Sequence, residues 1–249
     1  MIEIRGLVKR FGTLTAVDHL DLEIATGEIF GFLGPNGAGK TTTVKLLTGL
    51  LKPNAGTVRV AGFDVARETL AAKRCMGLVP DEPFVYPKLT GSEYLRFVGE
   101  LYGVPLGEQQ RRIPELLAMF ELSAWSGELL EAYSHGMRQK LVIAGIILHE
   151  PKVLVLDEPM VGLDPKSARL VKDIFQTLAR RGTAIFMCTH IMEIAEKLCH
   201  RIGIMIAGRL VALGSVDELR RKASGGGGLE DIFLSLTGGQ EYASLLRHL

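Results

Sequence analysis

Hydrophobic residues along the first third of the chain follow the spacing of β-strands. Apolar and polar positions alternate over residues 2–8 and 17–25, which predicts two antiparallel strands joined across residues 9–16. A continuous apolar run, "EIFGFLG", predicts a buried strand that ends in a glycine-rich turn, and "KTTTVKLLTGLL" predicts the helix behind it. Two further strand patterns follow: "GTVRVAGFDV", which fits a strand pair or hairpin, and "MGLV".

From about Thr90 to Glu150 the apolar spacing becomes helical and predicts helices over residues 92–103, 107–122 and 136–150. Beyond this block, strand and helix patterns alternate. The strands are "KVLVLDEP", "TAIFMCTH", "RIGIMIA" and "RLVALG", and the helices are Pro165 to Arg181 and "IMEIAEKLC". Buried apolar strands that alternate with helices predict an α/β fold with a mostly parallel sheet. We expect this sheet to carry an N-terminal antiparallel β sub-domain and a lateral helical sub-domain at about residues 90–150.

The end of the chain predicts a separate short element. "ASGGGG", residues 223–228, is typical of a flexible joint, so we divide the chain into a domain at residues 1–222 and a tail at 223–249. After the joint, one face of a short helix is apolar and is expected to dock back onto the domain; it carries Leu229, Ile232, Phe233 and Leu236.

Composition narrows the class of partners. The chain has 249 residues, 47% hydrophobic, with 29 basic and 28 acidic side chains and a net charge of +1. It contains no basic run that would bind nucleic acid. The longest apolar runs, such as Leu141 to Leu148, are too short to span a bilayer, and the first residues alternate like a strand rather than a signal peptide. We therefore expect a soluble protein that reaches a membrane only through a partner.

The cysteines indicate a reducing compartment and no structural metal. Cys75, Cys188 and Cys199 are odd in number and irregular in spacing, as expected for cytosolic thiols. Cys188, His190, Cys199 and His200 lie close in sequence, but neither C-x₂-C nor H-x₃-H spacing is present. A zinc site is rejected on that ground.

A phosphate-binding loop follows the first buried strand. "GPNGAGKT" matches G-x-x-x-x-G-K-[ST] between a predicted strand and a predicted helix, which is the context that this motif requires. Loop amides would surround the phosphates, Lys40 would supply positive charge and Thr41 a hydroxyl for Mg²⁺. The predicted phosphate-binding residues are Gly34, Pro35, Asn36, Gly37, Ala38, Gly39, Lys40, Thr41 and Thr42.

Two acidic residues and a histidine end the neighbouring strands. Asp157 follows a buried strand at the carboxyl edge of the sheet, where it can hold Mg²⁺, and Glu158 is then free to orient and deprotonate a water. His190 ends the next strand within reach of a terminal phosphate, although a lone histidine is more often structural. Phe11, after the first strand, either stacks on adenine or fills the core, and the sequence does not decide between them.

A second anion site is indicated by "YSHGMRQK", residues 133–140. Ser134 is a suitable N-cap for the apolar helix that follows, and Gly136 leaves the backbone bare for close approach to its amides. A helix N-terminus of this kind attracts an anion. A single chain has no evident use for a phosphate site distant from its first one.

Taken together, these motifs resemble the ATP-binding cassette of ABC transporters over about residues 1–236. "GPNGAGKT" resembles the family's Walker A, "VLVLDEP" its Walker B with the catalytic glutamate, "VGLDP" its D-loop, "TH" its switch histidine and "YSHGMRQ" its signature. The resemblance implies that Lys40, Glu158 and His190 serve ATP hydrolysis with Mg²⁺. It also implies that two cassettes pair head to tail, so that Ser134 and Gly136 face the partner's ATP.

The resemblance further implies an integral membrane permease as partner and a peripheral place on the cytoplasmic face of the membrane. "LEDIFLSLTGG", "PDEPF" and "YSHGM" resemble the bacterial branch that energises export. Two positions depart from the usual pattern: His135 stands for a glycine, and Asp81 stands for a glutamine on the loop that touches the nucleotide, the metal and the permease. A carboxylate only accepts hydrogen bonds, so the amide's role cannot be carried over unchanged. Phe84 and Tyr86 make the far end of that loop apolar, either as a docking surface or as core.

Three other function classes fit less well. A soluble cassette ATPase of DNA repair or translation usually carries two cassettes or long coiled-coil insertions, and neither is seen here. A GTPase would need an N-K-x-D motif, which is absent. A scaffold that binds nucleotide without hydrolysis has no need of Glu158 beside Asp157.

Overall fold

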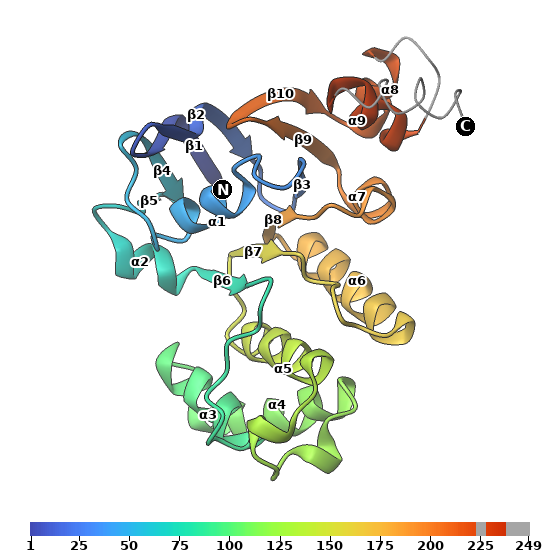
Figure 1. Cartoon of the computed structure of the whole chain (residues 1–249). Coiled ribbons are helices and arrows are strands. Elements are labelled where there is room, and N and C mark those ends of the chain that lie inside the picture. Colours follow the sequence, from blue (N-terminus) through green and yellow to red (C-terminus); the bar gives the residue numbers. More distant parts are fainter. Residues whose placement is uncertain (223–227, 238–249) are drawn as a thin grey trace.

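A six-stranded, mostly parallel sheet forms the centre of the molecule (Figure 1). The computed structural model describes residues 1–222 and 228–237 of the 249-residue chain. The strand order is β10-β9-β3-β8-β7-β6, and only β10 runs antiparallel to its neighbour. The strands are β3 (Ile29–Leu33), β6 (Met76–Val79), β7 (Val153–Asp157), β8 (Ala184–Cys188), β9 (Arg201–Ile206) and β10 (Arg209–Gly214). The predicted α/β class with a mostly parallel sheet is confirmed.

A four-stranded antiparallel sheet packs beside it, in the order β2-β1-β4-β5. Its strands are β1 (Ile2–Phe11), β2 (Leu14–Ile24), β4 (Ala55–Val60) and β5 (Phe63–Asp64). The predicted bounds of the first two strands were too short. Pairing continues to Phe11 opposite Leu14, so the connection is two residues rather than eight. Register shifts along this hairpin disturb the alternation of apolar side chains, which explains why the pattern faded before the strands ended.

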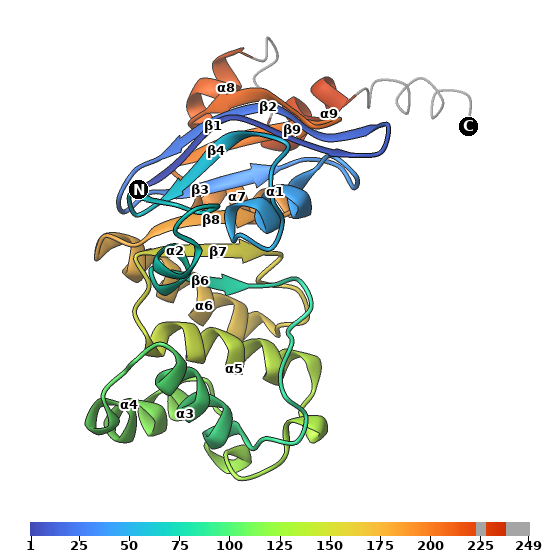
Figure 2. The ribbon, with the colours of Figure 1, turned by 90° about the vertical axis from the view of Figure 1, so that its left-hand side faces the viewer.

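Three helices form a layer at the end of the molecule opposite the antiparallel sheet (Figure 2). They are α3 (Gly91–Leu101), α4 (Leu106–Met119) and α5 (His135–Leu148), close to the predicted bounds. The remaining helices are α1 (Lys40–Leu47), α2 (Thr69–Arg74), α6 (Pro165–Arg180), α7 (Met192–Leu198), α8 (Val216–Lys222) and α9 (Leu229–Thr237). The pattern missed α2 and α8, which are too short for helical periodicity to stand out. None of the helices in residues 1–222 and 228–237 is long and apolar enough to cross a bilayer.

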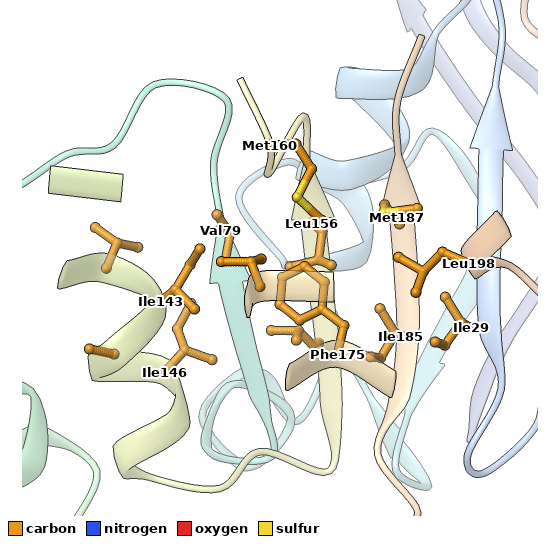
Figure 3. Close-up of a cluster of buried hydrophobic side chains, with 14 of the residues drawn as sticks. Ile29, Val79, Ile143, Ile146, Leu156, Met160, Phe175, Ile185, Met187 and Leu198 are labelled. Atoms are coloured by element: carbon orange, nitrogen blue, oxygen red, sulfur yellow. The ribbon is translucent and has the colours of Figure 1, made fainter. Parts of the chain in front are cut away.

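Two hydrophobic clusters lie on opposite faces of the central sheet. Successive strand residues point to opposite faces, so Leu156 joins one cluster and Val155 the other. Figure 3 shows the first cluster, in which Ile143 and Ile146 of α5 lie on the side of Val79 in β6. Each fully buried side chain of this size contributes about 1.5–3 kcal/mol. The helical layer is therefore tied to the same sheet that carries the acidic residues.

The C-terminal helix α9 packs onto the sheet domain beside α7 and α8. Leu229 and Ile232 are buried and Phe233 packs against the same cluster, as predicted. Leu236 is 40% exposed, so its predicted place on the buried face is wrong. The buried face of α9 therefore ends at Phe233, one turn before Leu236. Residues 223–227 of the predicted joint lie outside the described residues, and the boundary at residue 222 stays a prediction.

Candidate active site

The phosphate-binding loop passes through spaces too narrow for side chains. A Cβ added at Gly34 would lie 2.3 Å from the Met205 carbonyl oxygen, and one at Gly39 would lie 2.2 Å from the Ala16 carbonyl oxygen. Gly39 also has φ of 109°, a left-handed conformation that favours glycine, directly before α1 begins at Lys40. The motif glycines are therefore required by the backbone path. The loop leaves β3 directly, and carbonyl groups of β9 and β2 lie against its two glycines.

Lys40 lies over its own loop. Its ammonium nitrogen donates to the carbonyl oxygens of Gly34, at 2.6 Å, and Pro35, at 3.1 Å. The positive charge is thereby held at the N-terminus of α1, where helix amides already favour an anion. Its place fits the predicted interaction with outer phosphates.

A cavity of about 370 Å³ adjoins the loop. Phe11 lies at its edge and is 47% exposed, with the Lys9 ammonium 5.1 Å from the ring centroid. The lining residues are Phe11, Leu14, Thr15, Ala16, Asn36, Gly37, Gly39, Lys40, Thr41, Thr42, Ala207 and Gly208. The interpretation of Phe11 as core is therefore wrong, and an exposed ring facing a cavity can stack on a base.

Asp157 lies at the carboxyl end of β7 and is 5% exposed. Burial raises the pKa of its carboxyl, and the nearby charges of Asp81 and Glu158 raise it further. A hydrogen bond with the Thr41 side chain and the charge of Lys40 oppose that shift. A buried carboxyl among like charges and beside a hydroxyl suits a cation, which would favour its ionised form.

The donor set around Asp157 fits Mg²⁺ only with help from another ligand. Among residues 1–222 and 228–237, no group of three or more His, Cys, Asp or Glu side chains converges as in a stand-alone metal site. Mg²⁺ is usually bound through one or two carboxylates together with substrate phosphates. Thr41, Asp157 and Asp81 would hold such an ion, and the chemistry that it supplies is neutralisation of phosphate charge.

Glu158 is oriented by two neighbours from the end of β8. The Thr189 hydroxyl donates to its Oε2 at 3.0 Å, and His190 Nδ1 lies 2.8 Å from its Oε1. Glu158 itself has φ of 49°, which is rare for a residue other than glycine and is found at strained functional positions. The predicted role of this carboxylate toward a water stays a prediction. A carboxylate has about four acceptor sites, so it can still accept from a water.

Thr189 is the functional candidate that the sequence interpretation missed. It is 2% exposed, and its hydroxyl also accepts from the amide of Ile191 at 3.1 Å. Its place directly before His190 at the end of a buried strand was the available signal. His190 is exposed and lines a second cavity with Pro35, Asn36 and Phe233. The histidine therefore faces the phosphate-binding loop.

The proposed signature segment begins α5 as predicted. Ser134 is the N-cap, and its hydroxyl accepts from the Met137 amide at 3.3 Å. Ser134 and His135 are exposed, so the N-terminal end of the helix lies at the surface. None of the residues from 134 to 136 lines the cavity beside the phosphate-binding loop. The segment therefore lies away from the cavity of its own phosphate-binding loop.

The loop after Asp81 carries an exposed aromatic row. Phe84 is 75% exposed, and its ring centroid lies 5.9 Å from that of Tyr86, which lies 5.3 Å from that of Phe97 in α3. Both contacts are edge-to-face. The alternative in which Phe84 and Tyr86 fill the core is wrong, because both rings are exposed and the buried residues of this loop are Pro83 and Val85.

Sequence comparison identifies the family. The sequence model of the ABC transporter family matches residues 17–161, more than half of the chain. The chain belongs to the ABC transporter family. As such it is an ATP-binding and ATP-hydrolysing subunit, which confirms the predicted family, function and ATPase activity. The roles of individual residues and the magnesium ion stay predictions.

Several curated relatives cover most of this cassette. It is 36% identical to the linearmycin resistance ATP-binding protein of Bacillus subtilis, across 90% of this chain and 72% of that protein. It is 40% identical to a daunorubicin resistance ATP-binding protein of Streptomyces coeruleorubidus, across 95% and 74%. A solved ATP-binding subunit of an ABC transporter superposes with a TM-score of 0.91 at 31% identity, across 95% of this chain and 99% of that one.

A more distant structure supports the fold alone. A dimeric bacterial ABC transporter cassette matches with a TM-score of 0.80 at 23% identity, covering 86% of this chain and 98% of the other.

Proposed function

We propose that this cassette powers an exporter through ATP-driven head-to-tail pairing with a second ABC subunit. The observation that carries the proposal is the pair of incomplete sites on one chain. No residue of α5 lines the cavity beside Lys40, whereas the exposed Ser134 and the half-buried Gly136 lie at the N-terminal end of α5, away from that cavity. Two copies that face each other would bring each α5 N-terminus to the partner's γ-phosphate.

The residue roles follow from the geometry of the site. Lys40 would attract the outer phosphates, and Glu158 would act as the general base toward a water, oriented by Thr189 and His190. Thr41 and Asp157, with Asp81, would hold Mg²⁺. Phe11 would stack on adenine at the far end of the cavity.

The exposed row of Phe84, Tyr86 and Phe97 would dock on an integral membrane permease. Contiguous exposed apolar patches mark interaction sites, and aromatic residues are enriched at protein–protein interfaces. The near end of the same loop is Asp81, whose charge acts on Asp157. One loop would thus connect the ATP site to the permease, and the cassette would sit on the cytoplasmic face of the membrane.

Export is the direction that the relatives favour. Their names describe resistance to linearmycin and daunorubicin, and another, 38% identical, is a Nod factor export ATP-binding protein of Ralstonia nicotianae. The alternative is a soluble ABC-type ATPase that acts outside transport.

A pull-down from the native host distinguishes the two. Tagged cassette is recovered from detergent-solubilised membranes and from the soluble fraction, and ATPase activity is compared with that of the isolated chain. The proposal expects a co-purifying membrane protein and a changed turnover rate. Recovery from the soluble fraction alone, or together with nucleic acid, contradicts it.

A further inference from the structure

His135, one of the two side chains that depart from the family pattern, lies directly on Gly162 in the loop after Glu158. A Cβ built on Gly162 would lie 2.4 Å from His135 Nδ1 and 3.0 Å from its Cε1. Gly162 also has φ of 76°, so backbone conformation and close approach both require glycine there. The imidazole therefore rests on the backbone of this loop within one subunit.

Other contacts join the same two segments. A Cβ at Gly136 would lie 2.7 Å from the Gly162 carbonyl oxygen. One turn later, Gln139 Nε2 donates to the Pro159 carbonyl oxygen at 3.2 Å in a fully buried position. The first two turns of α5 thus contact both ends of residues 159–162, the residues that directly follow Glu158.

The contacts at the two ends of residues 159–162 differ in burial. The Gln139 bond is buried and fixes the start of the loop. The far end at Gly162 is exposed; a Cβ built there would have atoms of the His135 ring as its nearest neighbours, and a Cβ built at Gly136 would meet the Gly162 carbonyl group. Position 136 is itself a glycine, so the imidazole is the one side chain in this contact.

We propose that His135 is a positioning residue for ATP hydrolysis: its ring, resting on Gly162, holds residues 159–162 and through them Glu158 relative to the N-terminus of α5. The inference deepens the proposed function, because the α5 N-terminus is the part assigned to the partner's phosphate. Movement at that phosphate would reach Glu158 of the same chain. Misplacement of catalytic groups by about 1 Å can cost up to ~10²-fold in rate.

The first test compares His135→Gly with His135→Phe in steady-state ATPase assays. Loss of the ring should lower kcat by about three- to tenfold and leave equilibrium binding of ATP to the isolated chain unchanged, since His135 does not line that chain's nucleotide cavity. His135→Phe keeps a planar ring without ring nitrogens and should restore most of kcat. His19→Gly is the matched control, because His19 is exposed, lies in β2 and has φ of 50°. An unchanged kcat in His135→Gly, or no rescue by His135→Phe, overturns the proposal.

The second test is a double-mutant cycle. Gly162→Ala should lower both kcat and the melting temperature, and part of each loss should return in His135→Gly/Gly162→Ala, where the clash is gone. Additive losses overturn the proposal. Because melting of the isolated chain does not depend on pairing, this readout stands if ATP-driven dimerisation fails. Size exclusion of Glu158→Gln with Mg-ATP tests that pairing separately.

Discussion

Glu158 Oε1 lies 2.8 Å from Nδ1 of His190, a residue 32 positions later in the chain. The contact joins the end of β7 to the end of β8, and the adjacent parallel pairing of Asp157 with Cys188 fixes its register. Thr189 completes the arrangement from the buried side of the carboxylate. The carboxylate is therefore aimed by two strand ends rather than by a mobile loop, as a positioned general base requires.

Replacement of Glu158 by Gln should separate binding from turnover. The amide keeps the shape of the side chain and loses the base, so kcat should fall by about 10²- to 10⁴-fold while ATP affinity is retained. Equilibrium ATP binding and phosphate release measure the two quantities. If pairing follows ATP binding, this variant should also elute as a dimer with Mg-ATP. Wild-type turnover would remove the assignment of Glu158 as base.

Residues that end buried strands were predictable from the sequence, whereas their mutual orientation was not. Asp157 and His190 each follow an apolar run, and parallel strands bring their carboxyl ends to one edge. The Thr189 and Gln139 contacts depend on pairs 31 and 20 residues apart, which no local pattern encodes.

Mixed dimers should reveal whether α5 acts on the partner's nucleotide. Lys40→Ala should disable a subunit's own phosphate site, and Ser134→Arg should block the amides that it presents to its partner. A dimer with one variant of each kind has one doubly defective and one intact site, so part of the ATPase activity should return on mixing. Each homodimer alone is the control. Heterodimers that demonstrably form and stay inactive would show either that α5 does not act on the partner's nucleotide or that one site cannot hydrolyse ATP without the other.

Asp81→Asn should alter the pH dependence of hydrolysis as well as its rate. The negative charge of Asp81 raises the pKa of Asp157, so its removal lowers that pKa and keeps Asp157 ionised to lower pH. The acid limb of the ATPase profile should move to lower pH. At neutral pH the rate should fall modestly and need more Mg²⁺, because one anionic ligand is lost. ATPase rates across pH at saturating and at limiting Mg²⁺ measure both effects. An acid limb that moves to higher pH would refute the assignment of Asp81 as a charge that acts on Asp157.

Phe84→Ala should uncouple the cassette from the permease without unfolding it. The ring is 75% exposed, so its removal forfeits little buried area and should change stability by less than about 0.5 kcal/mol. Basal ATPase of the isolated chain should be retained, and stimulation by the co-purified membrane partner should be lost. Leu70→Ala, at an equally exposed apolar position in α2, is the matched control. Unchanged stimulation in Phe84→Ala, or its loss in Leu70→Ala, would exclude this surface as the specific docking site.

His149, at the C-terminal end of α5, should make the helical layer sensitive to acid. Its ring stacks on Tyr102 with centroids 3.7 Å apart and planes 7° apart, and burial lowers its pKa to about 4. An unfolded histidine has a pKa of about 6.5, so between these values the unfolded chain binds a proton that the folded chain does not. The contribution to stability is complete above pH 6.5 and falls as the pH drops toward 4, by about 3 kcal/mol at most.

His149→Phe should keep the stack on Tyr102 and remove the loss of stability that protonation of His149 causes at acid pH. Denaturant unfolding at pH 7.5 and pH 5 should show a smaller drop in free energy for the variant than for the wild type. The carboxyl groups present in both proteins cancel in that comparison. His135→Phe, a change to an exposed histidine at the other end of α5, should retain the wild-type drop. An equal drop in the free energy of unfolding for His149→Phe and wild type would mean that His149 is protonated in the folded protein as readily as in the unfolded chain. The stack of His149 on Tyr102 would then not make the helical layer sensitive to acid.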